Sequence, residues 1–503
     1  MSFVAPESNS TWLYLLLAVI VFVPIYALKL AKNRGKLPLP PGPPGKWPFG
    51  TRVPVAYSFL TFYEWTKQYG PVFSFKQGMN TVVIIGGFAE AMEIMEKEGA
   101  SLVDRPRSIA AGETLSGGMR VVLMNGEKVK KFRKALHSHL QPKVAATYEP
   151  LQLLSSQNYV LDILKRPEAH QDHAKKYAAS VVLTLAYGKT TPTSYSDPEV
   201  QRINECLSRL GDALRPGAYR VDTIPLLRYV PGYLDKLREA HRLELALFSE
   251  QLGGVLKKMT TGDFVPSFTS YLVENQSEIQ LSDNELAYLS GSIFGAGSET
   301  TASGLSFMIM AAACHPEAQT QVQNQLDQIV GKDRHPVFSD EELLSQVTAF
   351  YIECGRWRPI SAGGFPHQAT RDIHWRGYCI PKGATVIGNH WAIGRSPDAF
   401  PDGDTFDPQR WLTPHGTIRN DLKQFTFGFG RRVCPGLHVA NRSLFITTAL
   451  ILWAFKITPD PSKPIDTMAF TPTANVHPLP FSVRFEPRIP PEEIVRIFES
   501  GRH

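Results

Sequence analysis

The sequence has few cysteines, only a mild excess of positive charge and no internal repeat. Its 503 residues include only five cysteines, which are far apart in the chain: Cys206, Cys314, Cys354, Cys379 and Cys434. This spacing fits neither a disulfide framework nor a zinc site built on C-x-x-C pairs. The formal net charge of +6 comes from 53 basic and 47 acidic residues. The basic residues are spread along the chain, which argues against a nucleic-acid-binding protein.

A dinucleotide-binding fingerprint is also missing, because no G-x-G-x-x-G follows a strand-like segment. Apolar residues make up 43% of the chain and charged residues 20%. These values are ordinary for globular proteins and exclude a largely disordered or collagen-like chain. The length is enough for a large core or for several domains. With so few cysteines, the bulk of the chain is predicted to fold in a reducing compartment.

One long apolar run is present, close to the N-terminus. Residues 12–28 carry no charge, and at about 1.5 Å per residue such a helix reaches roughly 25 Å, just enough to cross a bilayer core. Four basic residues follow directly, which by the positive-inside rule places the C-terminal side in the cytosol. A cleaved signal peptide is the alternative, but the run is long for one and no small-residue cleavage site follows. We predict a membrane anchor at residues 1–36, with a single transmembrane helix at about 12–30.

The remainder, residues 37–503, is predicted to form one domain, because no low-complexity tract or block of charge marks a second boundary. It begins with a proline-rich hinge at residues 38–45, where proline stops a helix and stiffens the chain. Helical patterns dominate between residues 89 and 357. Strand-like segments fall at residues 72–75, 81–85, 373–386 and 481–485. The predicted fold class is mainly α with small β-sheets.

Residues 427–436 carry the strongest local signal. They read Phe-Gly-Phe-Gly-Arg-Arg-Val-Cys-Pro-Gly and precede an apolar run, 437–455, that is predicted to be a buried helix. Glycines permit a tight turn and close approach of the backbone to a flat group. Pro435 fits the first turn of the helix, which places Cys434 at its N-terminus. Free amides and the helix dipole stabilise a thiolate there. A plain core cysteine is the alternative, but the glycines, the arginine pair and the helix start together disfavour it.

This decapeptide resembles the haem-binding signature of the cytochrome P-450 family. The resemblance implies that Cys434 is the axial thiolate ligand of the iron in haem b. It also implies that Phe427 packs near the sulfur and that Arg432 pairs with a haem propionate. A thiolate ligand pushes electron density onto iron and favours cleavage of the O–O bond. The fold implied is the P-450 fold, tethered by one N-terminal transmembrane helix.

A second segment agrees with this resemblance. Residues 282–285 form a capping box, and the chain stays compatible with a helix up to Cys314. The middle of this helix, residues 295–301, is rich in small residues and in isolation could simply serve a close helix crossing. Beside Cys434, it resembles the oxygen-activation segment of the family. Glu299 and Thr300 then match the acid that relays protons and the alcohol that donates a hydrogen bond to iron-bound dioxygen.

Two further elements match the family downstream. Glu353 and Arg356 fit an E-x-x-R pattern, whose charges share one helix face. A surface ion pair is the ordinary explanation, whereas the family places both residues in a buried triad with Arg410. His367 stands where the family often has a propionate partner, and a satisfied core histidine is the equal alternative for it.

The clearest departure from the family lies upstream, at residues 126–134. This stretch aligns with an element that usually reads W-x-x-x-R: Arg133 is kept and by resemblance binds a propionate, but Val129 replaces the tryptophan. The stretch also carries four lysines: Lys128, Lys130, Lys131 and Lys134. A charge run is often only a solvated face. In this family, however, the helix lies on the proximal side, where an acidic reductase docks.

The function implied is that of a haem-dependent monooxygenase. One oxygen atom of O2 enters a lipophilic small molecule, the other leaves as water, and NADPH supplies two electrons. Because the chain has no dinucleotide fingerprint, an NADPH–cytochrome P-450 reductase must be a separate chain. A P-450-fold isomerase or dehydratase is one alternative, although such enzymes often lack the Glu299–Thr300 pair. A haem-carrying sensor or membrane scaffold without turnover is another.

The hinge, residues 215–225 and the Pro366–His367 pair look like fungal, particularly basidiomycete, microsomal members of the family. Many of these act in secondary metabolism such as terpenoid biosynthesis. The resemblance therefore implies a single-pass protein of the endoplasmic reticulum, with the catalytic domain on the cytosolic side of the membrane.

Overall fold

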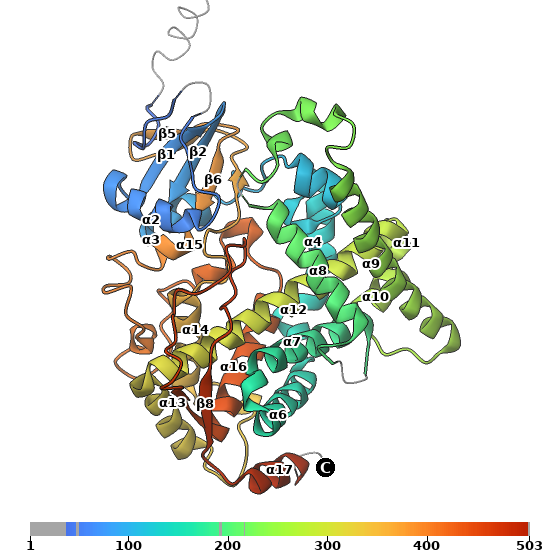
Figure 1. The fold of residues 1–503 in the computed structure, drawn as a ribbon, viewed down its shortest axis with the longest axis vertical. Coiled ribbons are helices and arrows are strands. Elements are labelled where there is room, and N and C mark those ends of the chain that lie inside the picture. The colour runs from blue at the N-terminus through green and yellow to red at the C-terminus, as the bar shows by residue number, and fades with distance from the viewer. Residues whose placement is uncertain (1–36, 47–49, 191–193, 216, 501–503) are drawn as a thin grey trace, which may run out of the picture.

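The computed structural model describes residues 37–46, 50–190, 194–215 and 217–500. The predicted anchor at residues 1–36 lies outside the described residues. Helices dominate the rest of the chain (Figure 1). They are α2 (Ser58–Tyr69), α3 (Phe88–Ala91), α4 (Gly126–Leu140), α5 (Pro142–Ala146), α6 (Glu149–Lys165), α7 (His170–Tyr187), α8 (Pro198–Ala213), α9 (Asp235–Thr261), α10 (Phe268–Glu274), α11 (Gln276–Ile279), α12 (Asp283–Cys314), α13 (Pro316–Ile329), α14 (Ser345–Trp357), α15 (His390–Ile393), α16 (Leu437–Ala454) and α17 (Pro491–Ser500).

The strands are short and form small sheets. They are β1 (Val72–Gln77), β2 (Asn80–Ile85), β3 (His367–Gln368), β4 (Ile373–Trp375), β5 (Tyr378–Ile380), β6 (Thr385–Gly388), β7 (Phe455–Pro459) and β8 (Val483–Pro487). The largest sheet has the order β1-β2-β6-β3, in which β2 and β6 are parallel and the other two pairs are antiparallel. β4 pairs with β5, and β7 pairs with β8. The predicted class, mainly α with small β-sheets, is confirmed.

Helix α12 is 32 residues long and runs through the middle of the molecule (Figure 1). It starts as predicted with a capping box, in which the Ser282 hydroxyl accepts from the Glu285 N–H and the Glu285 carboxylate accepts from the Ser282 N–H. It ends at Cys314, and Pro316 opens the next helix. Helices α7, α9 and α16 pack against it. The site described below is built on this helix.

The glycines of α12 allow close packing of its neighbours. A Cβ atom at Gly297 would lie 2.5 Å from a methyl group of Val182 on α7, and one at Gly291 would lie 2.3 Å from the Phe248 ring on α9. Neither neighbour could give way cheaply inside a packed core. The helix-crossing interpretation of the small residues is thus correct for Gly297, and it coexists with the positions of Glu299 and Thr300 on other faces of the same helix.

The apolar run after Cys434 forms α16, which is a core helix as predicted. Its C-terminal half, from Phe445 to Ala454, is buried throughout. Within the described ranges, α16 is also the one helix that is long and apolar enough to cross a membrane, but most of it is buried inside the protein. Its hydropathy therefore reflects its place in the core.

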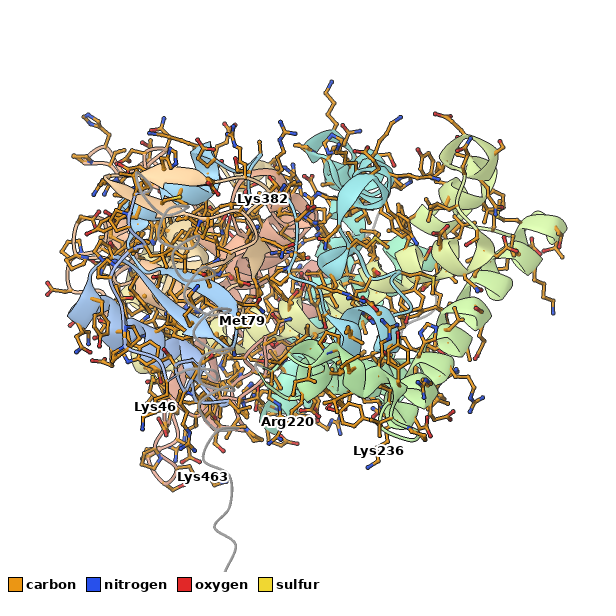
Figure 2. The ribbon with its side chains drawn as sticks, turned by 90° about the horizontal axis from the view of Figure 1, so that it is seen from above. Lys46, Met79, Arg220, Lys236, Lys382 and Lys463 are labelled. Atoms are coloured by element: carbon orange, nitrogen blue, oxygen red, sulfur yellow. The ribbon has the colours of Figure 1, made fainter. Side chains whose placement is uncertain are left out.

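An apolar surface lies at one end of the molecule. The turn between β1 and β2 carries Met79, which is 82% exposed, and the loop between α8 and α9 carries Leu226 and Tyr229, which are 74% and 77% exposed. The two segments are neighbours, because a Cβ atom at Gly78 would lie 3.5 Å from the Thr223 methyl group. Figure 2 views this end from above, with Met79 and the basic residues Lys46, Arg220 and Lys236 labelled.

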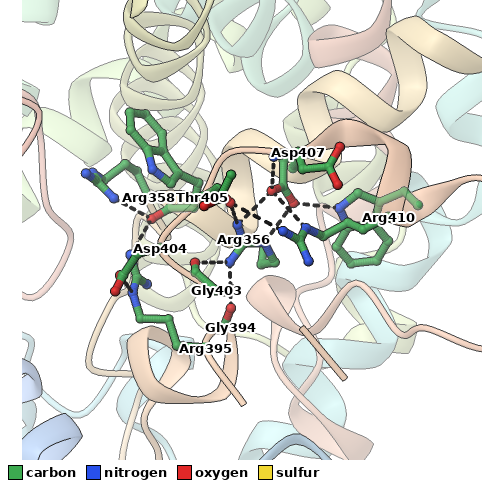
Figure 3. A network of polar contacts seen from close by, with 12 residues as sticks. Arg356, Arg358, Gly394, Arg395, Gly403, Asp404, Thr405, Asp407 and Arg410 are labelled. Atoms are coloured by element: carbon green, nitrogen blue, oxygen red, sulfur yellow. Dashed lines mark hydrogen bonds and ion pairs between the residues drawn. The ribbon is translucent and has the colours of Figure 1, made fainter. Parts of the chain in front are cut away.

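A buried ion pair on α14 connects that helix with the segment between residues 394 and 411. Arg356 donates to both carboxylate oxygens of Glu353, at 2.6 and 2.7 Å, and both side chains are fully buried. Arg410 reaches the same carboxylate at 3.2 Å, and the Trp411 indole N–H donates to it at 2.8 Å (Figure 3). Arg356 also donates to the carbonyl oxygens of residues 394, 403 and 405. The predicted triad of Glu353, Arg356 and Arg410 is confirmed.

We expect Glu353→Gln to destabilise the fold strongly. The substitution leaves the Arg356 guanidinium buried without its countercharge, a loss that typically costs about 3–5 kcal/mol. Chemical unfolding should show a large decrease in the midpoint. The matched control is Glu64→Gln, which removes an exposed pair with Lys67 and should change the midpoint little. Equal, small shifts in both variants would show that the triad is dispensable.

Candidate active site

The loop before α16 brings Cys434 to the start of that helix. Gly428 and Gly430 have φ angles of +85° and +54°, a region that residues with a Cβ rarely adopt. The Cys434 N–H donates to the Phe427 carbonyl at 2.8 Å, which closes the loop. A Cβ atom at Gly430 would lie 2.9 Å from the Cα of Gly99, so glycine is also needed here for close backbone contact.

The Cys434 thiol has an environment that suits a thiolate ligand. Burial raises its pKa, while the N–H of Gly436, the positive charge of Arg133 and the N–H of Leu437 act in the opposite direction. These groups would stabilise negative charge on the sulfur once a metal displaces the proton. Cys206 differs, because burial and the nearby charge of Glu244 both raise the pKa of its thiol, to about 11.

Four basic side chains gather near this loop: Arg105, Arg133, His367 and Arg432. Burial and the charges of Arg432 and Arg133 lower the pKa of Arg105 to about 9. Burial and then the charge of Arg133 lower the pKa of Arg432 to about 10. We call this group the cationic cluster. Its three arginines repel one another, and Arg105 and Arg432 are buried.

The cationic cluster is bonded to neutral groups of the chain. Arg432 donates to the carbonyl oxygens of Val103 and Met124, each at 2.5 Å. Arg133 donates to the Val433 carbonyl at 2.7 Å. Among the residues that the structure describes, no carboxylate forms an ion pair with the three arginines, although the nearby charge of Asp104 acts to raise the pKa of Arg432. Buried charge is costly unless it is paired, so the cluster indicates an anionic ligand.

The side chain of His367 lies on β3 with Nδ1 2.6 Å from the Leu102 carbonyl. Burial, followed by the charge of Arg105, lowers the pKa of this imidazole to about 3. The ring is thus neutral and donates through Nδ1. The two interpretations of His367 meet here: it is a hydrogen-bonded buried histidine and it also adjoins the cationic cluster.

Helices α12 and α16 each leave part of their surface open inside the molecule. Ala296 is exposed and Thr300 is half-buried, although both lie in the middle of the central helix α12. The first turns of α16 are half-buried as well. The helices touch at Gly304, where a Cβ atom would lie 3.2 Å from the Leu444 side chain. Ala296 and Thr300 precede this contact by about two turns and one turn of α12, and the half-buried start of α16 precedes it by about two turns of that helix.

Glu299 and Thr300 have defined partners. The Thr300 hydroxyl donates to the Ala296 carbonyl at 2.7 Å. A Glu299 carboxylate oxygen lies 2.7 Å from Nε2 of His477, which belongs to the C-terminal part of the chain. Nδ1 of His477 contacts the hydroxyl of Ser303, one turn beyond Glu299.

The comparison with known families decides the identity of this arrangement. A family model described as Cytochrome P450 matches residues 40–485. The chain belongs to the cytochrome P-450 family. Cytochrome P450 monooxygenase 64 of Postia placenta is 57% identical over 469 residues, which cover 92% of this chain and 95% of that protein.

More distant fungal relatives share nearly the full length. A cytochrome P450 monooxygenase of Armillaria gallica is 33% identical over 515 residues, covering 99% of this chain and 98% of the relative. Another, from Aspergillus ruber, is 34% identical over 454 residues, covering 88% and 84%. The chain is therefore a P-450 monooxygenase, an oxidoreductase that uses O2, a redox partner and a small-molecule substrate. The predicted resemblance to fungal members is confirmed.

P-450 enzymes carry a haem-thiolate cofactor, and the residues present fit that group. Haem b bears two propionate carboxylates, whose negative charges would pair with the arginines of the cationic cluster. A cysteine with N–H donors directed at its sulfur supplies the thiolate. The partly exposed residues of α12 and α16 include the small or apolar Ala296, Gly297, Leu437, Val439 and Ala440, beside the polar Glu299 and Thr300. Three independent features of the chain thus agree with one cofactor.

Sequence reasoning missed two residues of this site. Arg105 lies in the run Asp-Arg-Pro-Arg at residues 104–107, and nothing in its spacing distinguishes it from the exposed Arg107. His477 lies in a segment without a recognisable motif. Only the folded chain places Arg105 in the cationic cluster and His477 against Glu299. Val129, the departure from the usual tryptophan, is buried in the core around α4.

We expect Arg105→Gln to weaken haem retention without destabilising the haem-free protein. A charge-assisted hydrogen bond contributes about 1.5–3 kcal/mol, so haem release to apomyoglobin should become roughly tenfold faster or more. The haem-free variant should unfold at the same or a higher temperature, because one repelling buried charge is gone. Arg107→Gln removes an exposed guanidinium and is the control. Equal release rates in the two variants would exclude Arg105 as a haem contact.

Proposed function

We propose that this enzyme is a haem-thiolate monooxygenase in which Cys434 is the axial ligand of haem b. It inserts one atom of O2 into a lipophilic small molecule, with electrons from NADPH passed on by a separate NADPH–cytochrome P-450 reductase. The observation that carries the proposal is the position of Cys434: before the start of α16, with two N–H donors and a nearby arginine, beside three arginines that form no ion pair with a described carboxylate. Bound haem supplies the redox chemistry with dioxygen.

The chain's own residues would hold the cofactor from two directions. Arg105, Arg133 and Arg432 donate to the propionates, and His367 orders the same region through its bond to Leu102. Phe427 would pack near the sulfur, and the hydrogen bond from the Cys434 N–H to its carbonyl supports this. Each guanidinium already donates to backbone oxygens, so its direction is fixed before the cofactor arrives. Pre-organised donors lose little entropy on binding.

On the opposite side, α12 would supply the protons that the reaction consumes. Thr300 could release the Ala296 carbonyl and use its hydroxyl as a hydrogen-bond donor for the oxygen chemistry that haem would supply. Glu299 can hold and pass on a proton through water. Both groups are partly exposed within the protein, as proton transfer requires. This intact pair favours a monooxygenase over a P-450-fold isomerase or dehydratase, and NADPH-dependent turnover would exclude a scaffold role.

The substrate is proposed to be lipophilic, such as a terpenoid intermediate of fungal secondary metabolism. The fungal sources of the relatives support the same setting. Expression with a reductase in a host that supplies terpenoid scaffolds, with mass spectrometry of the products, tests it.

We expect Cys434→Ala to abolish the reduced-CO absorption band of a thiolate-ligated haem, because no other group replaces the sulfur at this position. Cys206→Ala is the matched control and should keep the band, since its thiol lies between α8 and the Glu244 charge, away from the loop. A Cys434→Ala protein that retained the band would place the ligand at another cysteine and overturn the proposal.

The reductase is proposed to dock over α4. Two of the four lysines are engaged within the chain: Lys128 pairs with Glu285 at 2.7 Å, and Lys131 donates to the Gln280 carbonyl. Lys130 and Lys134 lie one turn apart and are exposed, and Lys130 pairs only with the exposed Glu127. Arg431 of the cysteine loop is exposed as well. The docking surface therefore centres on Lys130, Lys134 and Arg431.

We expect exchange of Lys130 and Lys134 for Glu to slow electron transfer, because like charges then face each other where association depends on steering. The defect should shrink with salt, since the Debye length falls from about 10 Å at 0.1 M to about 3 Å at 1 M. Stopped-flow reduction of the haem by the reductase measures the effect. The control is the same exchange at Lys257 and Lys258, exposed on α9. An equal loss in peroxide-driven turnover, which bypasses the reductase, would contradict this docking surface.

The membrane is proposed to meet the protein at the apolar end that Figure 2 views from above. Leu226, Tyr229 and Met79 project there, with Lys46 and Arg220 nearby. Exposed aromatic and aliphatic side chains with basic neighbours suit a bilayer surface with anionic lipids. This surface supports the proposed single-pass attachment to the endoplasmic reticulum, with the catalytic domain in the cytosol. It would add to the predicted anchor.

A further inference from the structure

The C-terminal part of the chain forms a hairpin against the face of α12 that carries Glu299 and Ser303. We call residues 469–479 the C-terminal hairpin. The N–H of Thr471 donates to the His477 carbonyl at 2.9 Å, and the N–H of His477 donates to the Thr471 hydroxyl at 3.0 Å. The N–H of Val476 donates to the Ile360 carbonyl at 2.7 Å. The backbone on both sides of the His477 side chain is thus fixed.

The His477 imidazole bridges two residues of one face of α12. Glu299 and Ser303 are four residues apart, so their side chains lie one above the other on the helix. Nε2 of His477 lies 2.7 Å from the Glu299 carboxylate, and Nδ1 contacts the Ser303 hydroxyl. The contact with Glu299 is an ion pair when the ring is protonated; it lacks hydrogen-bond geometry, and Nε2 has no hydrogen-bond partner among the described residues.

The three side chains have the composition of a hydrolase triad but not its accessibility. Ser303 is 2% exposed, so its hydroxyl is closed to a substrate carbonyl and cannot act as a nucleophile. The side chains of Glu299 and His477 are each 26% exposed, which leaves room for water at the carboxylate. The arrangement can therefore orient a carboxylate and exchange protons, but it cannot form an acyl intermediate.

The contact with His477 decides where the Glu299 carboxylate lies. Glutamate has three rotatable bonds and loses rotamer freedom only when a partner holds its end. Among the described residues, no lysine or arginine pairs with Glu299, and His477 is the basic partner shown there. Without His477, the Glu299 side chain can adopt other rotamers in which its carboxylate no longer lies where it can pass a proton toward Thr300.

We propose that His477 is a positioning residue for proton delivery: it holds the Glu299 carboxylate through Nε2, and Ser303 fixes the ring through Nδ1. The C-terminal hairpin thereby sets the geometry of the acid on α12. This inference rests on the proposed function, in which Glu299 relays protons to the oxygen-binding side. It assigns a role to a residue outside every motif of the sequence.

Two amide substitutions separate the two ring nitrogens. The Asn side chain in His477→Asn carries a polar group near the place of Nδ1 but cannot reach Glu299. The longer side chain in His477→Gln extends to the place of Nε2 and keeps a donor for the carboxylate. His415→Asn, at an exposed loop position, is the matched control. All variants should keep the thiolate haem spectrum.

The first measurement is the share of NADPH electrons recovered as hydrogen peroxide, in full-length enzyme with reductase, O2 and a fluorogenic alkoxycoumarin as the lipophilic probe. His477→Asn should at least double this share with the KM for the probe unchanged, because proton delivery fails while the pocket persists. His477→Gln should stay near wild type, as should His415→Asn. A raised KM in both amide variants, with an unchanged peroxide share, would show a merely structural role and overturn the proposal.

The second measurement needs no turnover. In the resting enzyme, His477→Ala and Glu299→Ala should each at least double the deuterium uptake rate of peptides from the C-terminal hairpin, and the double variant should add nothing to the faster single one. Independent, additive effects or wild-type uptake would mean that the two side chains do not hold each other.

Thr300→Ala separates failure of this inference from failure of the proposed function. If it raises the peroxide share and His477→Asn does not, the monooxygenase stands and the role of His477 is wrong. If neither wild type nor any variant consumes NADPH with the reductase, the proposed function fails. The exchange experiment then still decides whether His477 holds Glu299.

Discussion

Positive charge that the protein chain leaves uncompensated in its interior is the constraint on which the site depends. Burial lowers the pKa of three arginines, and the charges of Arg432 and Arg133 add to the effect on Arg105. The fold tolerates this because each guanidinium is bonded to backbone oxygens, and because a large core surrounds the site. A ligand with two acidic arms converts the mutual repulsion into attraction. The unpaired, mutually repelling arginines raise the free energy of the haem-free protein. Binding an anionic cofactor removes this cost, which adds to the affinity.

Glu353 and Arg356 show the opposite solution to the same electrostatic problem. Their charges are buried more deeply than those of the cationic cluster, but they neutralise each other inside the chain. A pair of this kind supports the fold whatever else is bound. The protein therefore keeps two kinds of buried charge: one that is satisfied on folding, and one that is satisfied only when a cofactor arrives.

The features that could be predicted from sequence are those whose neighbours along the chain determine them. Cys434 is marked by the glycines and proline around it, α12 by its capping box, and Glu353 by Arg356 one helical turn away. Arg105 and His477 could not be predicted, because their partners come from distant segments and only tertiary packing brings them together. The lysines of α4 were predicted as one group, but the fold divides them: Glu285 neutralises Lys128, and Gln280 engages Lys131.

The cationic cluster also has a consequence for how the protein is made. Its members come from residues 105, 133, 367 and 432, so a ribosome releases the first two long before the last. If Cys434 and the cationic cluster hold haem as proposed, most of synthesis passes before the full set of binding groups exists. Haem is then captured only by a nearly finished chain. Supply of haem in the cell therefore acts on this enzyme at the final stage of its folding, where a shortage would leave a chain prone to opening and to removal by quality control.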